Sequence, residues 1–183
     1  TGFKDDFNDN ILTGWDVPQT TGTFTLTETD STLRIDYNRT SQSWEWDNFN
    51  FIPAEIIEVT SNPYITVKVK SDVGTVLTFK PVYDGTEMDW IQHTLSADNE
   101  WHLIKFELSD DDPYYIDRIY MYLDGGSTES KSGTVWFEDM RIGDSVRTAD
   151  VLDLTELEQL ISDANTLHDL SVEGDGEGEF ETG

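Results

Sequence analysis

The sequence has no cysteine and few basic residues. Its 183 residues include 11 Lys and Arg against 38 Asp and Glu, so the formal net charge is −27. Without cysteine no disulfide can stabilise the fold, which must depend on its core or on a metal. The shortage of cations argues against nucleic acid and anionic membrane surfaces, because binding to either requires clustered Lys and Arg. We interpret the excess of acid as a solvated surface suited to a salty, marine setting.

Long apolar segments are also missing. No stretch approaches the roughly 20 consecutive apolar residues that a membrane-spanning helix needs. The chain is nevertheless long enough for one domain with a sizeable core and a short appendage. A cysteine-free chain suits a bacterial protein that is secreted or displayed at the cell surface, and we expect that location.

What the sequence does contain is aromatic residues, at 12%, and short segments in which apolar and polar residues alternate. In residues 134–142, Val135 and Phe137 alternate with Trp136 and Glu138, which is the period of a β-strand. Similar segments, separated by turn signals, lie at residues 4–7, 24–28, 33–37, 64–70, 75–83, 89–95, 101–108 and 116–124. About nine strands without intervening helices predict an all-β fold over residues 1–146, an antiparallel β-sandwich and most simply a jelly roll.

From residue 147 onward the pattern changes. Five apolar residues between Leu157 and Leu167 lie at helical spacing, and Thr155 with Glu158 fits a capping box. Residues 173–179 then alternate acidic residues with glycine, a composition typical of disorder. We therefore predict that residues 147–183 form an acidic linker with one amphipathic helix and a disordered C-terminal part.

Two acidic residues, Glu138 and Asp139, lie within the last predicted strand. More oxygen ligands occur beside aromatic residues in the first predicted strand, at residues 3–9. Buried carboxylates are costly unless they are paired, hydrogen-bonded or bound to a metal. We hypothesise that the first and last strands meet and share a structural calcium. The alternative is that these acids are solvated turn residues.

Four pieces of the sequence, taken in order, resemble secreted bacterial carbohydrate-binding modules with a jelly-roll fold. They are Asp5-Asp-Phe-Asn8, Trp101-His-Leu-Ile-Lys-Phe-Glu-Leu108, Ile116-Asp-Arg-Ile-Tyr-Met-Tyr-Leu123 and Gly133-Thr-Val-Trp-Phe-Glu-Asp-Met-Arg-Ile142. The resemblance covers residues 3–144. It implies a non-catalytic, monomeric module that binds polysaccharide and is tethered to catalytic modules of a polysaccharide-degrading enzyme.

The same resemblance implies a calcium site that joins the chain ends. By position, Asp139 on the closing strand is the central ligand, together with Asp6 or Asn8 from the first strand. Glu28 and Asp30, at the first hairpin turn, complete a cage of oxygen ligands of the kind that Ca²⁺ prefers.

A sugar-binding surface requires flat aromatic rings and fixed polar groups. In a jelly roll the third, fifth, sixth and eighth strands share one sheet, and alternation predicts which of their residues face outward. With Trp46 from an adjoining loop, the predicted concave binding face consists of Arg34, Asp36, Trp46, Lys80, Trp90, Gln92, Arg118, Tyr120 and Tyr122. We expect the other tryptophans Trp15, Trp101 and Trp136 to lie in the core or to cover a sheet.

Three of the eleven cations would share this face. Arginine pairs bidentately with carboxylate or sulfate, so the cluster predicts an anionic glycan, such as a uronic-acid polymer like alginate or a sulfated one. The alternative is that Arg34, Lys80 and Arg118 neutralise neighbouring acids while Trp90 packs under a loop.

Two other functional classes remain open. Some polysaccharide lyases are jelly rolls, and Ile91-Gln-His93 is faintly similar to the glutamine–histidine motif of alginate lyases, although in a different order. The companion motifs that supply a base, an acid and a carboxylate neutraliser are absent, so we expect no catalytic residues. The third class is a structural or adhesive module of a cell-surface protein that binds no sugar.

Overall fold

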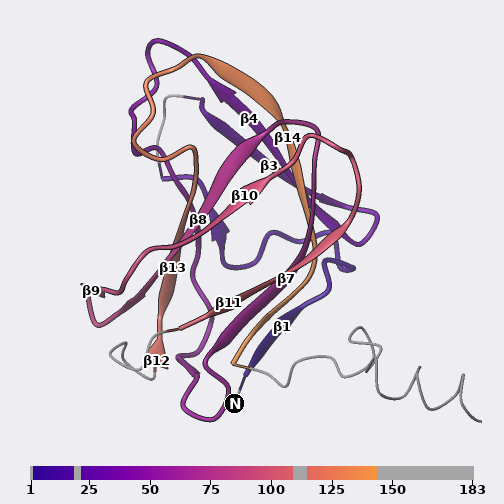
Figure 1. The fold of residues 1–183 in the computed structure, drawn as a ribbon. Coiled ribbons are helices and arrows are strands. Elements are labelled where there is room, and N and C mark those ends of the chain that lie inside the picture. The colour runs from indigo at the N-terminus through magenta and orange to yellow at the C-terminus, as the bar shows by residue number, and fades with distance from the viewer. Residues whose placement is uncertain (1, 19–21, 109–114, 144–183) are drawn as a thin grey trace, which may run out of the picture. The chain divides into compact units, whose positions relative to one another are not determined.

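The computed structural model describes residues 2–18, 22–108 and 115–143, and these form a β-sandwich (Figure 1). The chain divides into two units, Thr1–Val146 and Arg147–Gly183. The predicted boundary after residue 146 and the predicted tail helix lie outside the described residues. Within the described residues no helix is present that could cross a membrane.

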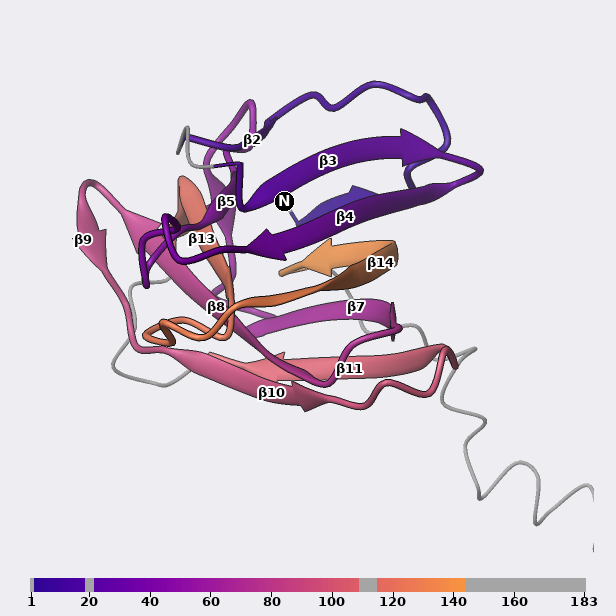
Figure 2. The same cartoon turned by 90° about the horizontal axis from the view of Figure 1, so that it is seen from above.

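Two six-stranded antiparallel sheets make up the sandwich (Figure 2). Sheet A has the order β11-β7-β14-β4-β3, with β1 also paired to β14. Its strands are β11 (His102–Glu107), β7 (Tyr64–Ser71), β14 (Lys131–Ile142), β4 (Thr32–Arg39), β3 (Phe24–Thr29) and β1 (Phe3–Asp5).

Sheet B has the order β10-β8-β13-β5-β2, with β9 also paired to β8. Its strands are β10 (Ile91–Leu95), β8 (Thr75–Tyr83), β13 (Arg118–Leu123), β5 (Phe49–Phe51), β2 (Trp15–Asp16) and β9 (Thr86–Glu87). A small third pair joins β12 (Tyr115–Ile116) to β6 (Ile57–Glu58). The predicted all-β antiparallel sandwich is confirmed.

The core consists of the inward-facing residues of both sheets, as the alternation predicts. Val67 on β7, Phe79 on β8, Ile119 on β13 and Phe137 on β14 are all buried. Phe137 packs 6.3 Å from Phe79 between ring centroids, so the two sheets meet through aromatic rings. Burial of these side chains supplies most of the driving force for folding, at about 1.5–3 kcal/mol each.

One predicted sheet assignment is wrong. The segment around residues 33–37, now β4, was expected beside β8, β10 and β13, but it pairs with β14 in sheet A, from Lys131 opposite Arg39 to Phe137 opposite Leu33. The place next to β13 is taken by β5, a short strand that the alternation did not predict. Residues on the outer side of β4 therefore belong to the opposite surface of the sandwich.

The closing strand contains a β-bulge. Its register with β7 shifts between Glu138 and Arg141, and Asp139 has a positive φ of 48°. The bulge interrupts alternation, so Asp139 and its neighbour Met140 are both buried. Such irregularities re-aim individual side chains within an otherwise regular ladder.

Candidate functional site

The outer face of sheet B gathers most of the predicted sugar-binding residues. Tyr120 on β13 lies opposite Lys80 on β8, and Tyr122 lies opposite Thr78, which in turn lies opposite Gln92 on β10. Trp90 immediately precedes β10, and Arg118 begins β13. We call this surface the sheet B face, and it consists of Trp46, Lys80, Trp90, Gln92, Arg118, Tyr120 and Tyr122.

Three aromatic rings pack together at one end of this face. Trp90 stacks on Tyr122 with ring centroids 5.5 Å apart and an interplanar angle of 16°. Trp46 meets both rings edge-on, at 4.8 Å from Trp90 and 5.8 Å from Tyr122. Tyr122 is buried, whereas Trp90 remains 41% exposed. The cluster therefore offers one indole to solvent on a support of two further rings.

The phenol of Tyr122 is held neutral by its surroundings. Burial, followed by the negative charge of Glu87 and then by Tyr120, raises the pKa of Tyr122 to about 12. The hydroxyl therefore keeps its proton, and its capacity to donate a hydrogen bond, at any physiological pH.

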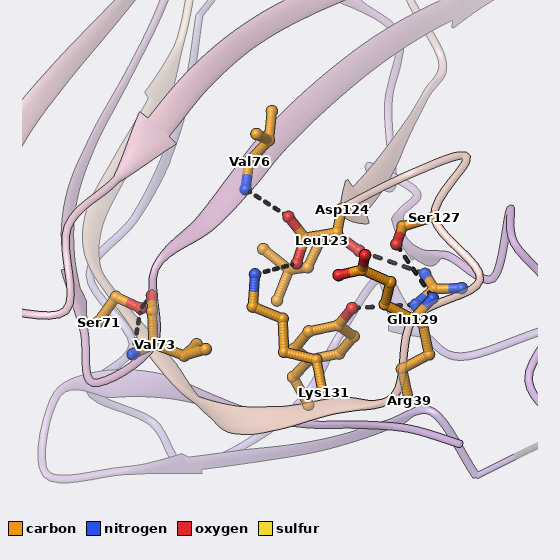
Figure 3. Close-up of polar contacts among 10 residues, drawn as sticks. Arg39, Ser71, Val73, Val76, Leu123, Asp124, Ser127, Glu129 and Lys131 are labelled. Carbon is orange, nitrogen blue, oxygen red and sulfur yellow. Dashed lines mark hydrogen bonds and ion pairs between the residues drawn. The ribbon is translucent and has the colours of Figure 1, made fainter. Parts of the chain in front are cut away.

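A buried arginine, Arg39, connects the loop that carries Trp46 to the end of β13, and Figure 3 shows its side chain beside Leu123. The guanidinium of Arg39, only 2% exposed, donates from Nη1 to the Trp44 carbonyl at 2.9 Å and from Nη2 to the Leu123 carbonyl at 3.3 Å. Its Nε donates to the hydroxyl of Tyr37 at 3.0 Å. Arg39 thus joins the Trp46 loop to the strand end next to Tyr122, and the aromatic cluster is ordered before any ligand arrives.

Two glycines allow the Trp46 ring to pack closely against the backbone. A Cβ atom on Gly125 would lie 3.0 Å from the Trp46 ring, and one on Gly126 would lie 3.2 Å from it. The Gly126 amide also donates to the Glu45 carbonyl at 2.8 Å. The absence of side chains at these two positions lets the indole lie directly against the backbone.

Both cations of the sheet B face lie close to acidic residues. Lys80 forms an ion pair with Glu87, and its Nζ lies 4.6 Å from the Trp90 ring centroid. Arg118 donates from Nη1 to the hydroxyl of Tyr120 at 3.2 Å. A pocket of about 340 Å³ beside Arg118 is lined by Val82, Asp84, Gly85, Glu87, Asp117, Arg118 and Tyr120. Its lining carries more carboxylates than cations.

Arg34 and Asp36 do not join this face, which corrects the prediction that they would. Both lie on β4 in sheet A, where Arg34 donates from Nη2 and Nε to Asp36 Oδ1 at 2.8 and 3.0 Å. Arg34 lies opposite Trp136 across the β4–β14 ladder. The pairing with Asp36 matches the alternative that these charges neutralise each other.

Among the predicted calcium ligands, Glu28 has the most unusual surroundings. It shares an inward-facing row with Leu33 and Phe137, and it is 7% exposed. Neither of its carboxylate oxygens has a hydrogen-bond partner of good distance and angle among the described residues, although the Asp9 carboxyl group and the Asn10 amide lie close by. Burial, and then the nearby carboxyl groups of Asp9 and Asp5, raise the pKa of Glu28 above its ordinary value of 4.5. A bound cation would relieve this accumulation of negative charge around Glu28.

The remaining predicted ligands are placed differently. Asp6 forms an exposed ion pair with Lys4 at 3.3 Å, and Asn8 and Asp30 are exposed. The buried Asp139 accepts a hydrogen bond from Arg141 Nε at 3.3 Å. Across the part of the chain that the structure describes, no three His, Cys, Asp or Glu side chains form a ready metal-binding group. The calcium site therefore stays a prediction, with Asp9 and Asp5 beside Glu28 instead of Asp6 and Asn8.

No family model matches the sequence, and no curated protein matches it. Solved structures match in fold. A mutant of a family 29 carbohydrate-binding module superposes with a TM-score of 0.55 at 14% identity, over 81% of this chain and 98% of that chain. A mutant of the module CBM29-2 gives 0.54 at 12% identity, over 78% and 84%. Another CBM29-2 mutant, complexed with mannohexaose, gives 0.50 at 13% identity, over 78% and 90%. At these identities the similarity confirms the predicted fold alone.

Proposed function

We propose that this protein is a non-catalytic module that binds a polysaccharide on the sheet B face. The observation that carries the proposal is the cluster of Trp46, Trp90 and Tyr122, which presents one exposed indole on an ordered support. Similar folds belong to carbohydrate-binding modules, one of them solved with mannohexaose. We also propose that the module is monomeric, is secreted or held at the cell surface, and directs an attached polysaccharide-degrading enzyme to its substrate.

The chemistry of the face suits a sugar chain. The C–H face of a pyranose ring stacks on Trp90, and Trp44, 60% exposed in the loop that Arg39 anchors, can stack on a second sugar unit. Hydroxyl groups of the sugar meet donors and acceptors on Gln92 and Tyr120. Because the rings are already in place, binding costs little conformational entropy.

For the sheet B face we propose that acid groups on the glycan are not required. Lys80 is already paired with Glu87, and the pocket next to Arg118 also contains Asp84 and Asp117. An added carboxylate would therefore meet negative charge here. The preference for an anionic glycan predicted from the sequence stays a prediction for this face, supported by Arg118 alone.

The proposal includes a structural calcium at the N-terminal end of sheet A. Glu28, Asp9 and Asp5 are the residues that would hold it. Bound there, the ion would neutralise their mutual repulsion and connect the first segment of the chain to the β3–β4 hairpin. The ion has a structural role in this account and takes no part in sugar binding.

Affinity gel electrophoresis against neutral mannans and glucans and against acidic polysaccharides tests the function. We expect retardation of the wild-type protein by a neutral glycan and its loss in Trp90→Ala. A matched control is Trp101→Ala on the opposite sheet, since Trp101 is 39% exposed against 41% for Trp90. Retardation without product formation supports a binding module. Product release would indicate an enzyme, and no retardation by any glycan would indicate a structural module.

A further inference from the structure

The outer face of sheet A presents a second aromatic surface, with a cation between two indoles. Trp136 on β14 lies opposite both Arg34 on β4 and Lys70 on β7. His102 lies opposite Val69, so Trp101, one residue earlier, lies beside Lys70. The strands therefore align a row across the sheet in the order Arg34, Trp136, Lys70 and Trp101. We call this row the sheet A face.

The ammonium group of Lys70 is held by both rings. Its Nζ lies 4.6 Å from the ring centroid of Trp136 and 5.0 Å from that of Trp101. Both distances are within the range of cation–π attraction. Trp101 is 39% exposed and Trp136 is half-buried, so the cluster is open to solvent along one side.

Lys70 differs from its neighbours Lys68 and Arg34, because each of those two cations forms an ion pair. Lys68, the next outward residue on β7, forms an ion pair with Glu138 at 3.9 Å, and Arg34 pairs with Asp36 at 2.8 Å. Within the described residues Lys70 has no carboxylate at ion-pair distance, although the sequence contains 38 acidic residues against 11 basic ones. Lys105 on β11 also lies over an aromatic ring, that of Tyr64, and has no ion pair within the described residues, but Lys70 is the one of the two that lies between two indoles.

We propose that the sheet A face binds an acidic sugar unit, namely a uronate residue of a polysaccharide. The sugar's C–H face would stack on the exposed indole of Trp101, and its carboxylate would accept a hydrogen bond from the Lys70 ammonium. A neutral sugar would gain only the stacking. The carboxylate complements the unneutralised charge, which is why an acidic ligand is favoured on this face and not on the sheet B face.

This inference concerns a different sheet from the proposed neutral-glycan surface and does not depend on it. If both surfaces bind, the module carries two glycan sites on the outer sides of opposite sheets. One copy could then hold a neutral chain and an acidic chain at the same time, as in a mixed cell-wall or matrix material.

Isothermal titration of the full chain with a hexamer of galacturonic acid at low salt tests the proposal. We expect the wild type to bind and Lys70→Met, which keeps the length of the side chain, to weaken binding about tenfold or more, since a charge-assisted hydrogen bond is lost. Lys68→Met is the matched control on the same strand and face, and we expect it to change affinity less than threefold or so. Trp90→Ala should leave binding of the uronate hexamer unchanged.

Three results would overturn the proposal: no binding by the wild type, equal losses in Lys70→Met and Lys68→Met, or a loss confined to Trp90→Ala. The last would move acidic-glycan binding to the sheet B face. Near-ultraviolet circular dichroism checks that Lys70→Met is folded. If it is not, Trp101→Ala takes its place, and it should weaken binding of the uronate hexamer more than Lys68→Met does. Neutral-glycan binding by Lys70→Met is measured as well, so that failure of the acidic-sugar site on the sheet A face can be distinguished from failure of the proposed function on the sheet B face.

Discussion

The two outer faces of the sandwich carry similar residues in different electrostatic states. On the sheet B face Lys80 lies over Trp90 but is paired with Glu87. On the sheet A face Lys70 lies over two indoles, and the described residues include no carboxylate paired with it. The exposed tryptophans, Trp90 and Trp101, are nearly equally accessible. Under the two proposals, an exposed indole supplies the stacking surface on each face, and the pairing of the adjacent cation decides whether a neutral or an acidic sugar is favoured.

Substitution of Arg39 should have the largest effect on this comparison, because the Arg39 side chain supports only the sheet B face. Arg39→Leu would leave the buried carbonyls of Trp44 and Leu123 without donors, and we expect the free energy of unfolding to fall by about 3 kcal/mol or more. Neutral-glycan binding should weaken as the Trp46 loop loosens. Urea unfolding and calorimetric titration measure the two effects. Arg34→Leu, an exposed arginine paired with Asp36, should cost about 1 kcal/mol or less. Equal costs in the two variants would contradict the role of Arg39.

Removal of calcium should affect stability without distinguishing the two faces. If Glu28 and Asp9 hold the ion, saturating calcium at a hundredfold excess over its dissociation constant stabilises the fold by about 2.7 kcal/mol. A chelator should therefore lower the thermal midpoint by several degrees, on the order of 4–10 °C, while both glycan affinities at 25 °C stay the same. An unchanged midpoint would reject the site, and loss of affinity at one face would give the ion a role in binding.

Glu28→Gln provides the pH test of the same residue. The pKa of Glu28 is raised in the folded state, so the folded protein holds this proton more tightly than the unfolded chain does. Without calcium, stability should therefore fall as pH rises from the ordinary value of 4.5 through the raised pKa, and Glu28→Gln should lessen that fall. With calcium present the variant should lose the ion's stabilisation. Urea unfolding between pH 4 and about pH 8, with and without calcium, measures both effects on the free energy of unfolding. Identical pH profiles for the two proteins would contradict the assignment.

The smallest expected effect comes from adding a side chain to Gly126, which packs against the Trp46 ring. Gly126→Ala places a Cβ 3.2 Å from the indole at a φ of +80°, so we expect a loss of about 1 kcal/mol in stability together with weaker neutral-glycan binding. Gly22→Ala is the control, because its φ is +76° and nothing lies within 4 Å of the added atom. The control should lose similar stability and keep its affinity. Equal affinities in both variants would show that the placement of Trp46 is unimportant.

Alternation in the sequence was enough to predict nine of the described strands, the core and the outward residues of β8, β10 and β13, but not β2, β5, β6, β9 and β12, each of two or three residues. It could not assign β4 to its sheet, because pairing depends on the contacts of β14 and on the three-residue strand β5, too short to show a period. The bulge at Asp139 gives no sequence signal that alternation can read.

The sheet A face was missed for a related reason. Trp101 and Trp136 were interpreted as structural residues because they belong to the strand patterns themselves. The signal that could have found the face was present, since Lys70 and Trp136 both fall on outward positions of their strands. Only the register between β7, β14 and β11 shows that the three side chains share a row. Likewise, the sequence pattern did not show that Asp9 and Asp5 are the carboxyl groups near Glu28.

The most direct measurement of the central claim uses the indole N–H signals of the six tryptophans in ¹H–¹⁵N spectra, assigned with single Trp→Phe variants. During titration with mannohexaose, the signals of Trp46 and Trp90 should shift with a common saturation curve while those of Trp101 and Trp136 stay in place. Shifts confined to Trp101 and Trp136, or calorimetric binding without any change at Trp46 and Trp90, would contradict the assignment of the sheet B face.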